Sequence, residues 1–240
     1  MQPPTPAPPS DSAESRNLAT RHAEPARART RRLRELHRSF ARELRRRTGV
    51  RAGGGIAVAI AAGFGLAIVV QPGDGESARP LIASSLWGIS IFGVGPAAVS
   101  LAGHSREPCR DTRQLAALRG IDWTTVETAR YGAGLSTLFG VALWPSVALC
   151  ALAGFSSVDV ALALSELALV VPVALYAAAL AIALGTLAHV SVRLVPHHAR
   201  FTVIALLLIP QLLRAIWPNT PSVPAAFDWL LGMTFRSTAP

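Results

Sequence analysis

Long apolar stretches that are nearly free of ionisable residues dominate this sequence. A transmembrane helix needs about 20 consecutive apolar residues. The stretches cover residues 52–71, 81–102, 133–154, 163–189 and 201–217. Hydrophobic residues make up 51% of the chain and charged residues 15%, a low charge content for a soluble protein. We therefore predict an all-α fold, a polytopic membrane helix bundle of about five transmembrane helices within residues 51–217.

Small residues recur at helical spacing in the first and third stretches. They are Gly55, Ala59, Gly63 and Ala67 in the first, and Gly132, Ser136 and Gly140 at the third. Small residues spaced four apart let two helices approach closely in a membrane. We predict that both sets form helix-packing faces. In the second stretch, Pro96 removes a helix hydrogen bond and predicts a kink.

A basic segment precedes the first apolar stretch. Residues 1–25 are Pro-rich and polar, which predicts a disordered tail. Residues 26–50 are dense in Arg, and Leu33, Leu36, Phe40 and Leu44 form one narrow apolar stripe at helical spacing. This pattern is typical of an amphipathic interfacial helix that binds membrane lipid. A nucleic-acid arm and an organellar targeting sequence are the alternatives, and the acidic residues of the tail count against targeting. We predict no nucleic-acid partner.

The polar loop 103–132 separates the second and third stretches. It is predicted to form two short helices that break at Gly120, each with a small apolar face and a charged one. Such a segment can lie on the membrane or dock into a soluble partner. The candidate docking residues are Arg110, Arg113, Leu115, Leu118, Arg119, Trp123 and Val126.

The distribution of Arg predicts the orientation of the chain. The segment before Ala52 holds thirteen of the 23 Arg, and loop 103–132 holds five more. Loops rich in positive charge stay in the cytoplasm. We predict a cytoplasmic N-terminus and, after five spans, a C-terminus outside. Residues 218–240 then form an outer interfacial segment with an interfacial or re-entrant helix.

The sequence contains few residues that could carry chemistry. It has no Lys, which excludes a P-loop lysine and a Schiff-base lysine. His197 and His198 have no carboxylate or thiol nearby, so we predict surface residues and no metal site. Cys109 and Cys150 lack redox spacing and are predicted to be free thiols. We predict no catalytic site, no cofactor and no enzymatic activity in this chain.

Two charged residues fall inside predicted spans. Glu166 and Arg214 each lie about one turn from the outer end of spans four and five. Charge inside a membrane is costly, so an intramembrane ion pair is one interpretation. The alternatives are that both side chains reach the outer headgroups, or that the pair serves a substrate or a gate.

The order of these parts resembles the permease subunit of a type-2 ABC exporter. The resemblance lies in the basic helix RRLRELHRSFARELRRRTG, the charged loop REPCRDTRQLAALRGIDWTTVETAR and the Pro- and aromatic-rich segment IPQLLRAIWPNTPSVPAAFDWLLGM. It implies a permease without ATPase activity, driven by a separate nucleotide-binding ATPase that docks on the loop. It also implies a homodimer or hetero-oligomer and, with the Ala- and Arg-rich composition, a bacterial inner membrane. Members of that family usually have a sixth span, and the sequence shows no sixth apolar stretch.

Two other functions are consistent with the sequence. The chain could be a scaffold or accessory subunit of a larger membrane complex, with the small-residue stripes as packing faces. A membrane-anchored regulator whose basic tail binds lipid or nucleic acid is the third hypothesis. The sequence does not indicate a substrate.

Overall fold

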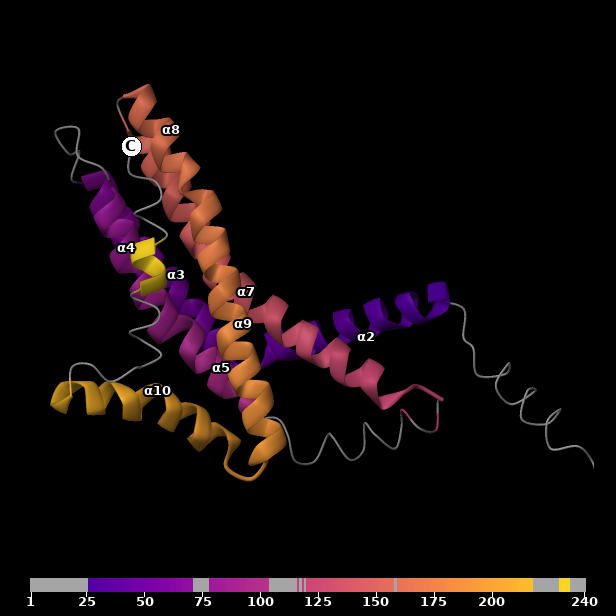
Figure 1. Ribbon diagram of the computed structural model, residues 1–240. Helices are drawn as coiled ribbons and strands as arrows, with labels where there is room; N and C mark the ends of the chain where they lie inside the picture. The colour runs from indigo at the N-terminus through magenta and orange to yellow at the C-terminus, as the bar shows by residue number, and fades with distance from the viewer. Residues whose placement is uncertain are drawn as a thin grey trace, which may run out of the picture.

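A computed structural model describes residues 26–70, 78–103, 116, 118, 120–157, 159–217 and 229–233. Every regular element in these ranges is a helix (Figure 1). The elements are α2 (Ala26–Arg46), α3 (Thr48–Val70), α4 (Arg79–Gly88), η1 (Ile89–Val94), α5 (Gly95–Ala102), α7 (Trp123–Ser156), α8 (Val160–Ala168), α9 (Val170–Leu194) and α10 (Ala199–Ile216). Residues 229–233 add a short helical segment. The predicted all-α class is confirmed.

Four helical segments of the described chain are long and apolar enough to cross a membrane. They are α3, the continuous run α4–η1–α5, α7, and the run α8–α9. These four correspond to the first four predicted spans. The chain is therefore built as a multi-pass membrane protein, and Figure 1 shows the four segments gathered into one bundle.

Helix α10 differs from the predicted fifth span. The described part of its apolar run, Ala199–Ile209, is shorter than a crossing needs, and the helix contacts α9 and α5. Figure 1 shows α10 lying across the lower end of the bundle and not alongside the spans. Of the described side chains in α10, Ala199 and Val203 are buried and Leu207 packs against the core, whereas most of the other large apolar side chains of the helix are exposed.

The segment after α10 returns to the bundle. Within residues 229–233, Leu231 is buried in the main hydrophobic core and Leu230 packs against it. The described part of the predicted outer interfacial segment therefore contacts the spans directly, and the remainder lies outside the described residues.

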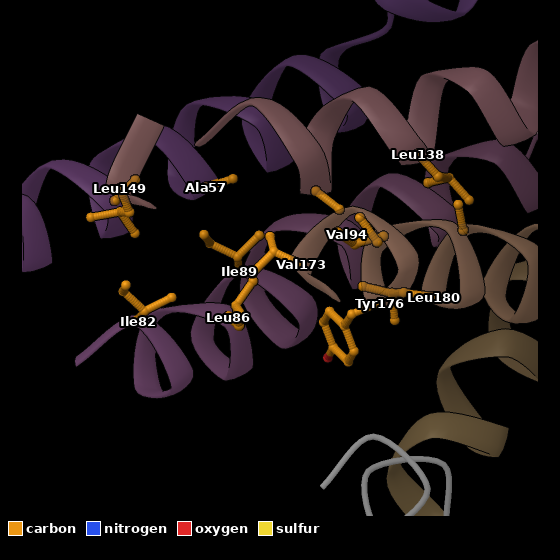
Figure 2. Close-up of a cluster of buried hydrophobic side chains, with 14 of the residues drawn as sticks. Ala57, Ile82, Leu86, Ile89, Val94, Leu138, Leu149, Val173, Tyr176 and Leu180 are labelled. Atoms are coloured by element: carbon orange, nitrogen blue, oxygen red, sulfur yellow. The ribbon is translucent and has the colours of Figure 1, made fainter. Parts of the chain in front are cut away.

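The core lies between the four spans. Figure 2 shows Ala57 of α3, Ile82 and Leu86 of α4, Ile89 of η1 and Val173 of α9 converging on one cluster. Most of the large hydrophobic side chains on the opposite faces of these helices are exposed, as expected for a surface that meets lipid.

The packing face of α3 is not the predicted stripe. Gly55, Ala59 and Gly63 are exposed and Ala67 is half-buried. The buried face carries a second set of small residues, displaced by two positions: Gly53, Ala57, Ala61 and Gly65. Within this chain the displaced set forms the packing face, and the packing of the predicted stripe against another helix stays a prediction.

A π-helix interrupts the second span. In η1, each turn is wider than in an α-helix, and Pro96 follows directly in the first turn of α5. A proline inside a regular helix collides with the carbonyl group four residues earlier, so a local widening before Pro96 relieves that clash. Turns of this type are frequent at functional sites.

A buried hydrogen bond crosses from this π-helix to α9. The Ser90 hydroxyl donates to the Leu86 carbonyl oxygen at 2.7 Å, and its oxygen lies 2.6 Å from the Tyr176 hydroxyl. Both residues are buried. The bond therefore links the irregular part of span two to span four.

We expect Ser90→Ala and Tyr176→Phe to be coupled in a double-mutant cycle. Hydrogen bonds between membrane helices contribute about 0.6 kcal/mol on average and at most about 1.7 kcal/mol. The measurement is unfolding of the detergent-purified variants. Ser146→Ala is the matched control, because the buried Ser146 hydroxyl donates within its own helix to Ala142. Additivity of the Ser90 and Tyr176 effects would contradict a bond between them.

The basic helix α2 packs on the protein and not only on lipid. Leu44 and Ala41 are buried against Ala133 of α7, with Phe40 packed beside them. His37 Nε2 lies 3.3 Å from the Ser136 hydroxyl, and Gly132 faces the same His ring. The predicted apolar stripe of α2 and part of the predicted Gly132–Ser136 face therefore meet each other.

Candidate functional site

A cleft opens between α7 and α9 near the ends where α2 and α5 also meet them. It encloses about 100 Å³ and is lined by residues of all four helices. Its apolar lining includes Leu44, Leu101, Val126, Leu135 and Val192. Its polar lining is Glu127, Arg130 and Tyr131 from α7 with His189 and Arg193 from α9. The cleft thus has an apolar wall and a cationic one.

The polar residues of the cleft cross-link the two helices. Arg193 donates to the Glu127 carboxylate in an ion pair. The Tyr131 hydroxyl lies 2.8 Å from the Thr186 hydroxyl, and the Tyr131 and His189 rings have centroids 5.1 Å apart at 55°. Residues three and four apart share one face of a helix, so Glu127, Arg130 and Tyr131 all face α9.

Further Arg residues lie outside the lining of the cleft. Arg45, Arg46 and Arg51 are exposed near the α2–α3 junction, and Arg200 Nη2 donates to the Gly103 carbonyl at 3.4 Å. We call this part of the molecule the basic end, defined by Arg45, Arg46, Arg47, Arg51, Arg130, Arg193 and Arg200.

Burial and the neighbouring charges both act on Arg47. Partial burial lowers the pKa of the Arg47 guanidinium, repulsion from Arg130 and Arg200 adds to this, and Glu43 opposes it. Arg47 Nη2 donates to Glu43 Oε1 at 3.0 Å. Arg47 stays charged, as Arg does in proteins. The guanidinium groups of Arg130 on α7 and Arg200 on α10 repel it.

The predicted docking residues differ in solvent exposure. Leu118 is 84% exposed and available to a partner, whereas Val126 is only 2% exposed. Val126 is therefore a packing residue, because it faces the cleft between the helices. Trp123 is half-buried at the start of α7 and lines the same cleft. Arg110, Arg113, Leu115 and Arg119 lie outside the described residues.

The predicted break at Gly120 is present. Gly120 has a φ of 63°, a left-handed conformation that glycine adopts without steric cost. The chain turns there before α7 begins at Trp123. This turn joins the predicted docking loop to α7, which is the longest single helix described.

Glu166 lies near the end of span four, as predicted, and its side chain is directed into the protein. Its side chain is fully buried in α8, and Oε1 accepts a hydrogen bond of 3.1 Å from the Ala78 backbone N–H at the start of α4. A carboxylate is stabilised at a helix N-terminus. Glu166 therefore does not reach to the headgroups. The Arg214 side chain lies outside the described residues, and α10 lies at the opposite end of the bundle from α8 (Figure 1), which removes the expected equal depth of the pair.

The remaining chemistry-bearing residues are dispersed. Among the described residues, no group of three or more His, Cys, Asp or Glu gathers at one point. His197 and His198 are exposed in the turn between α9 and α10. Cys150 is buried in α7 with a free thiol, and Cys109 lies outside the described residues.

Sequence reasoning missed the α9 half of the cleft. Neither His189 nor Arg193 was among the predicted site residues. One signal was available: Thr186, His189 and Arg193 are spaced three and four apart, which places them on one helical face.

Known proteins provide no guide to this site. No model of a protein family, no curated protein and no solved structure matches the chain. The function is therefore argued from the chain's own residues.

Proposed function

We propose that this chain is the permease subunit of an ATP-driven exporter and that a separate ATPase docks on loop 103–132. The observation that carries the proposal is the length of α7. Its 34 residues rise about 51 Å at 1.5 Å per residue, whereas a bilayer core is about 30 Å thick. Span three therefore continues without a break into an arm that begins at the docking loop.

The arm contacts α2 on one side and α9 on the other. Helix α2 runs along the first part of α7, away from the bundle (Figure 1). On the other side, the Glu127–Arg193 and Tyr131–Thr186 contacts join the arm to α9. A displacement of loop 103–132 by the docked ATPase would move α7 as a rigid body and shift spans three and four, as rigid-body switching requires.

The spans contain a place where packing can change. The π-helix η1 carries Ser90, whose hydroxyl contacts Tyr176 in span four. A wide turn can revert to a regular one with a small shift of register, so η1 could repack when span four moves. This fits a permease that alternates between two arrangements.

The orientation follows from the basic end. Positive charge marks the cytoplasmic side, and α2, the start of α7 and the end of α9 all lie there. We place the N-terminus and loop 103–132 in the cytoplasm of a bacterial cell, with the subunit in the inner membrane as a homodimer or hetero-oligomer.

Affinity purification of the tagged full-length protein in mild detergent tests the proposal, with co-eluting proteins identified by mass spectrometry. We expect a stoichiometric soluble partner that carries a P-loop lysine motif, GxxxxGK[ST]. Arg113→Glu and Arg119→Glu are expected to abolish its co-elution. Arg34→Glu is the matched control, an equal charge change at an exposed site of α2.

The rival function is a scaffold subunit of a larger membrane complex. The outward-facing stripe of Gly55, Ala59 and Gly63 favours it, because nothing lies within 4 Å of a Cβ added at either glycine. Co-elution of other membrane subunits without an ATPase, together with unchanged co-elution in Arg113→Glu and Arg119→Glu, would replace the permease proposal with this one.

A further inference from the structure

The cleft between α7 and α9 has room for a small charged group. Its volume of about 100 Å³ falls below the roughly 300–1,000 Å³ of drug-sized ligand sites. A single water needs about 10–15 Å³ by the same kind of measure. The cleft therefore holds a compact group such as a phosphate, and anything larger must extend out of it.

The donors in the cleft suit a phosphate. Arg130 and Arg193 present guanidinium groups, which bind phosphate oxygens in a two-pronged geometry, and Tyr131 adds a hydroxyl. Glu127 is the one carboxylate among the described residues of the lining. Two Arg against one Glu leave the lining with a formal charge of +1, and the nearby Arg47 and Arg200 of the basic end add to it.

The apolar wall indicates where the rest of the ligand lies. Leu101, Leu135 and Val192 line the cleft beside the Arg residues, and Trp123 stands at its edge. A free inorganic anion gains nothing from such a wall. A phospholipid does, because its acyl chains can follow the apolar surface while its phosphate meets the guanidinium groups.

We propose that this cleft is a binding site for an anionic phospholipid, with the headgroup phosphate bound between Arg130 and Arg193. Basic pockets between membrane helices bind anionic headgroups by the same chemistry. The bound phosphate and the Glu127 carboxylate both interact with Arg193. Because Arg130 lies on α7 and Arg193 on α9, the phosphate links the two helices. This inference does not depend on the presence of an ATPase partner.

Native mass spectrometry of the full-length protein in neutral detergent tests the site. Phosphatidylglycerol, phosphatidylcholine and inorganic phosphate serve as separate probes. We expect one tightly retained phosphatidylglycerol, weaker retention of phosphatidylcholine, and no displacement of the lipid by millimolar phosphate. Arg130→Gln with Arg193→Gln should weaken retention by about tenfold or more, since hydrogen bonds to charged groups are strong.

Two variants separate binding from simple loss of structure. Arg45→Gln with Arg46→Gln removes the same charge from exposed positions at the basic end and should leave tight retention intact. Glu127→Gln should tighten retention, because it frees Arg193 from its ion pair. Equal retention of phosphatidylcholine, displacement by inorganic phosphate, equal effects of the two Arg pairs, or weaker retention in Glu127→Gln would each overturn the proposal.

Discussion

Replacing Gly53 with Leu is expected to destabilise the bundle more than any other change in α3. A Cβ at Gly53 would lie 2.3 Å from the Gly93 carbonyl oxygen and 3.4 Å from Ala97 Cβ. The obstacle is backbone of η1, which cannot rotate away as a side chain can. Overpacking of this kind costs about 1–3 kcal/mol and occasionally more. The loss is measured as a lower free energy of unfolding in detergent.

Gly55→Leu is the matched control for this prediction. It makes the same substitution in the same helix, two residues away, where nothing lies within 4 Å of the added Cβ. Leucine favours a helix over glycine by up to about 1 kcal/mol, so Gly55→Leu should be neutral or stabilising. If both variants lost equal stability, the assignment of the packing face to Gly53 would be wrong.

The α3 face illustrates a limit of sequence reasoning. Gly55, Ala59, Gly63 and Ala67 satisfy the spacing rule, and so do Gly53, Ala57, Ala61 and Gly65. Both sets are small, and the surrounding residues are apolar on every side because one face meets lipid. The choice depends on the partner helix, where Gly93 alone lets the backbones touch. That contact joins residues forty positions apart.

The membrane-spanning architecture, by contrast, follows from local composition. Four of the predicted spans are present because apolar runs of this length with almost no charge cannot fold otherwise in a bilayer. The stretch 201–217 is also apolar but shorter and contains Arg214, and it contacts the bundle through Val203 and Leu207. In the sequence, the shorter length of this stretch was the main difference from the four spans.

The candidate site could be predicted only in part. The Arg content of the sequence predicts the charge of the basic end, and Trp123 was among the candidate docking residues. The cleft itself arises from the register between α7 and α9, which sets Glu127 opposite Arg193 and Tyr131 opposite Thr186. Sequence spacing reveals which residues share a face of one helix. It carries no information about which faces of two helices meet.

Glu166→Ala is expected to cause a second large loss of stability. The Glu166 carboxylate is fully buried and accepts from the Ala78 N–H, which has no partner within α4 because it stands at the helix start. The bond is partly buried, and leaving its donor unsatisfied costs up to about 3 kcal/mol. Glu166→Gln should lose much less, because its amide oxygen can still accept. Unfolding in detergent measures both variants.

Asp159 provides the exposed counterpart of this contact. Its carboxylate accepts from the Ala161 N–H at the start of α8 at 3.1 Å, but the bond is exposed to solvent. Asp159→Ala should cost about 1 kcal/mol or less, because water can replace an exposed cap. A larger loss in Asp159→Ala than in Glu166→Ala would contradict the importance of burial. An equal loss in Glu166→Gln and Glu166→Ala would mean that charge at the α4 N-terminus, and not the hydrogen-bond acceptor, holds spans two and four together.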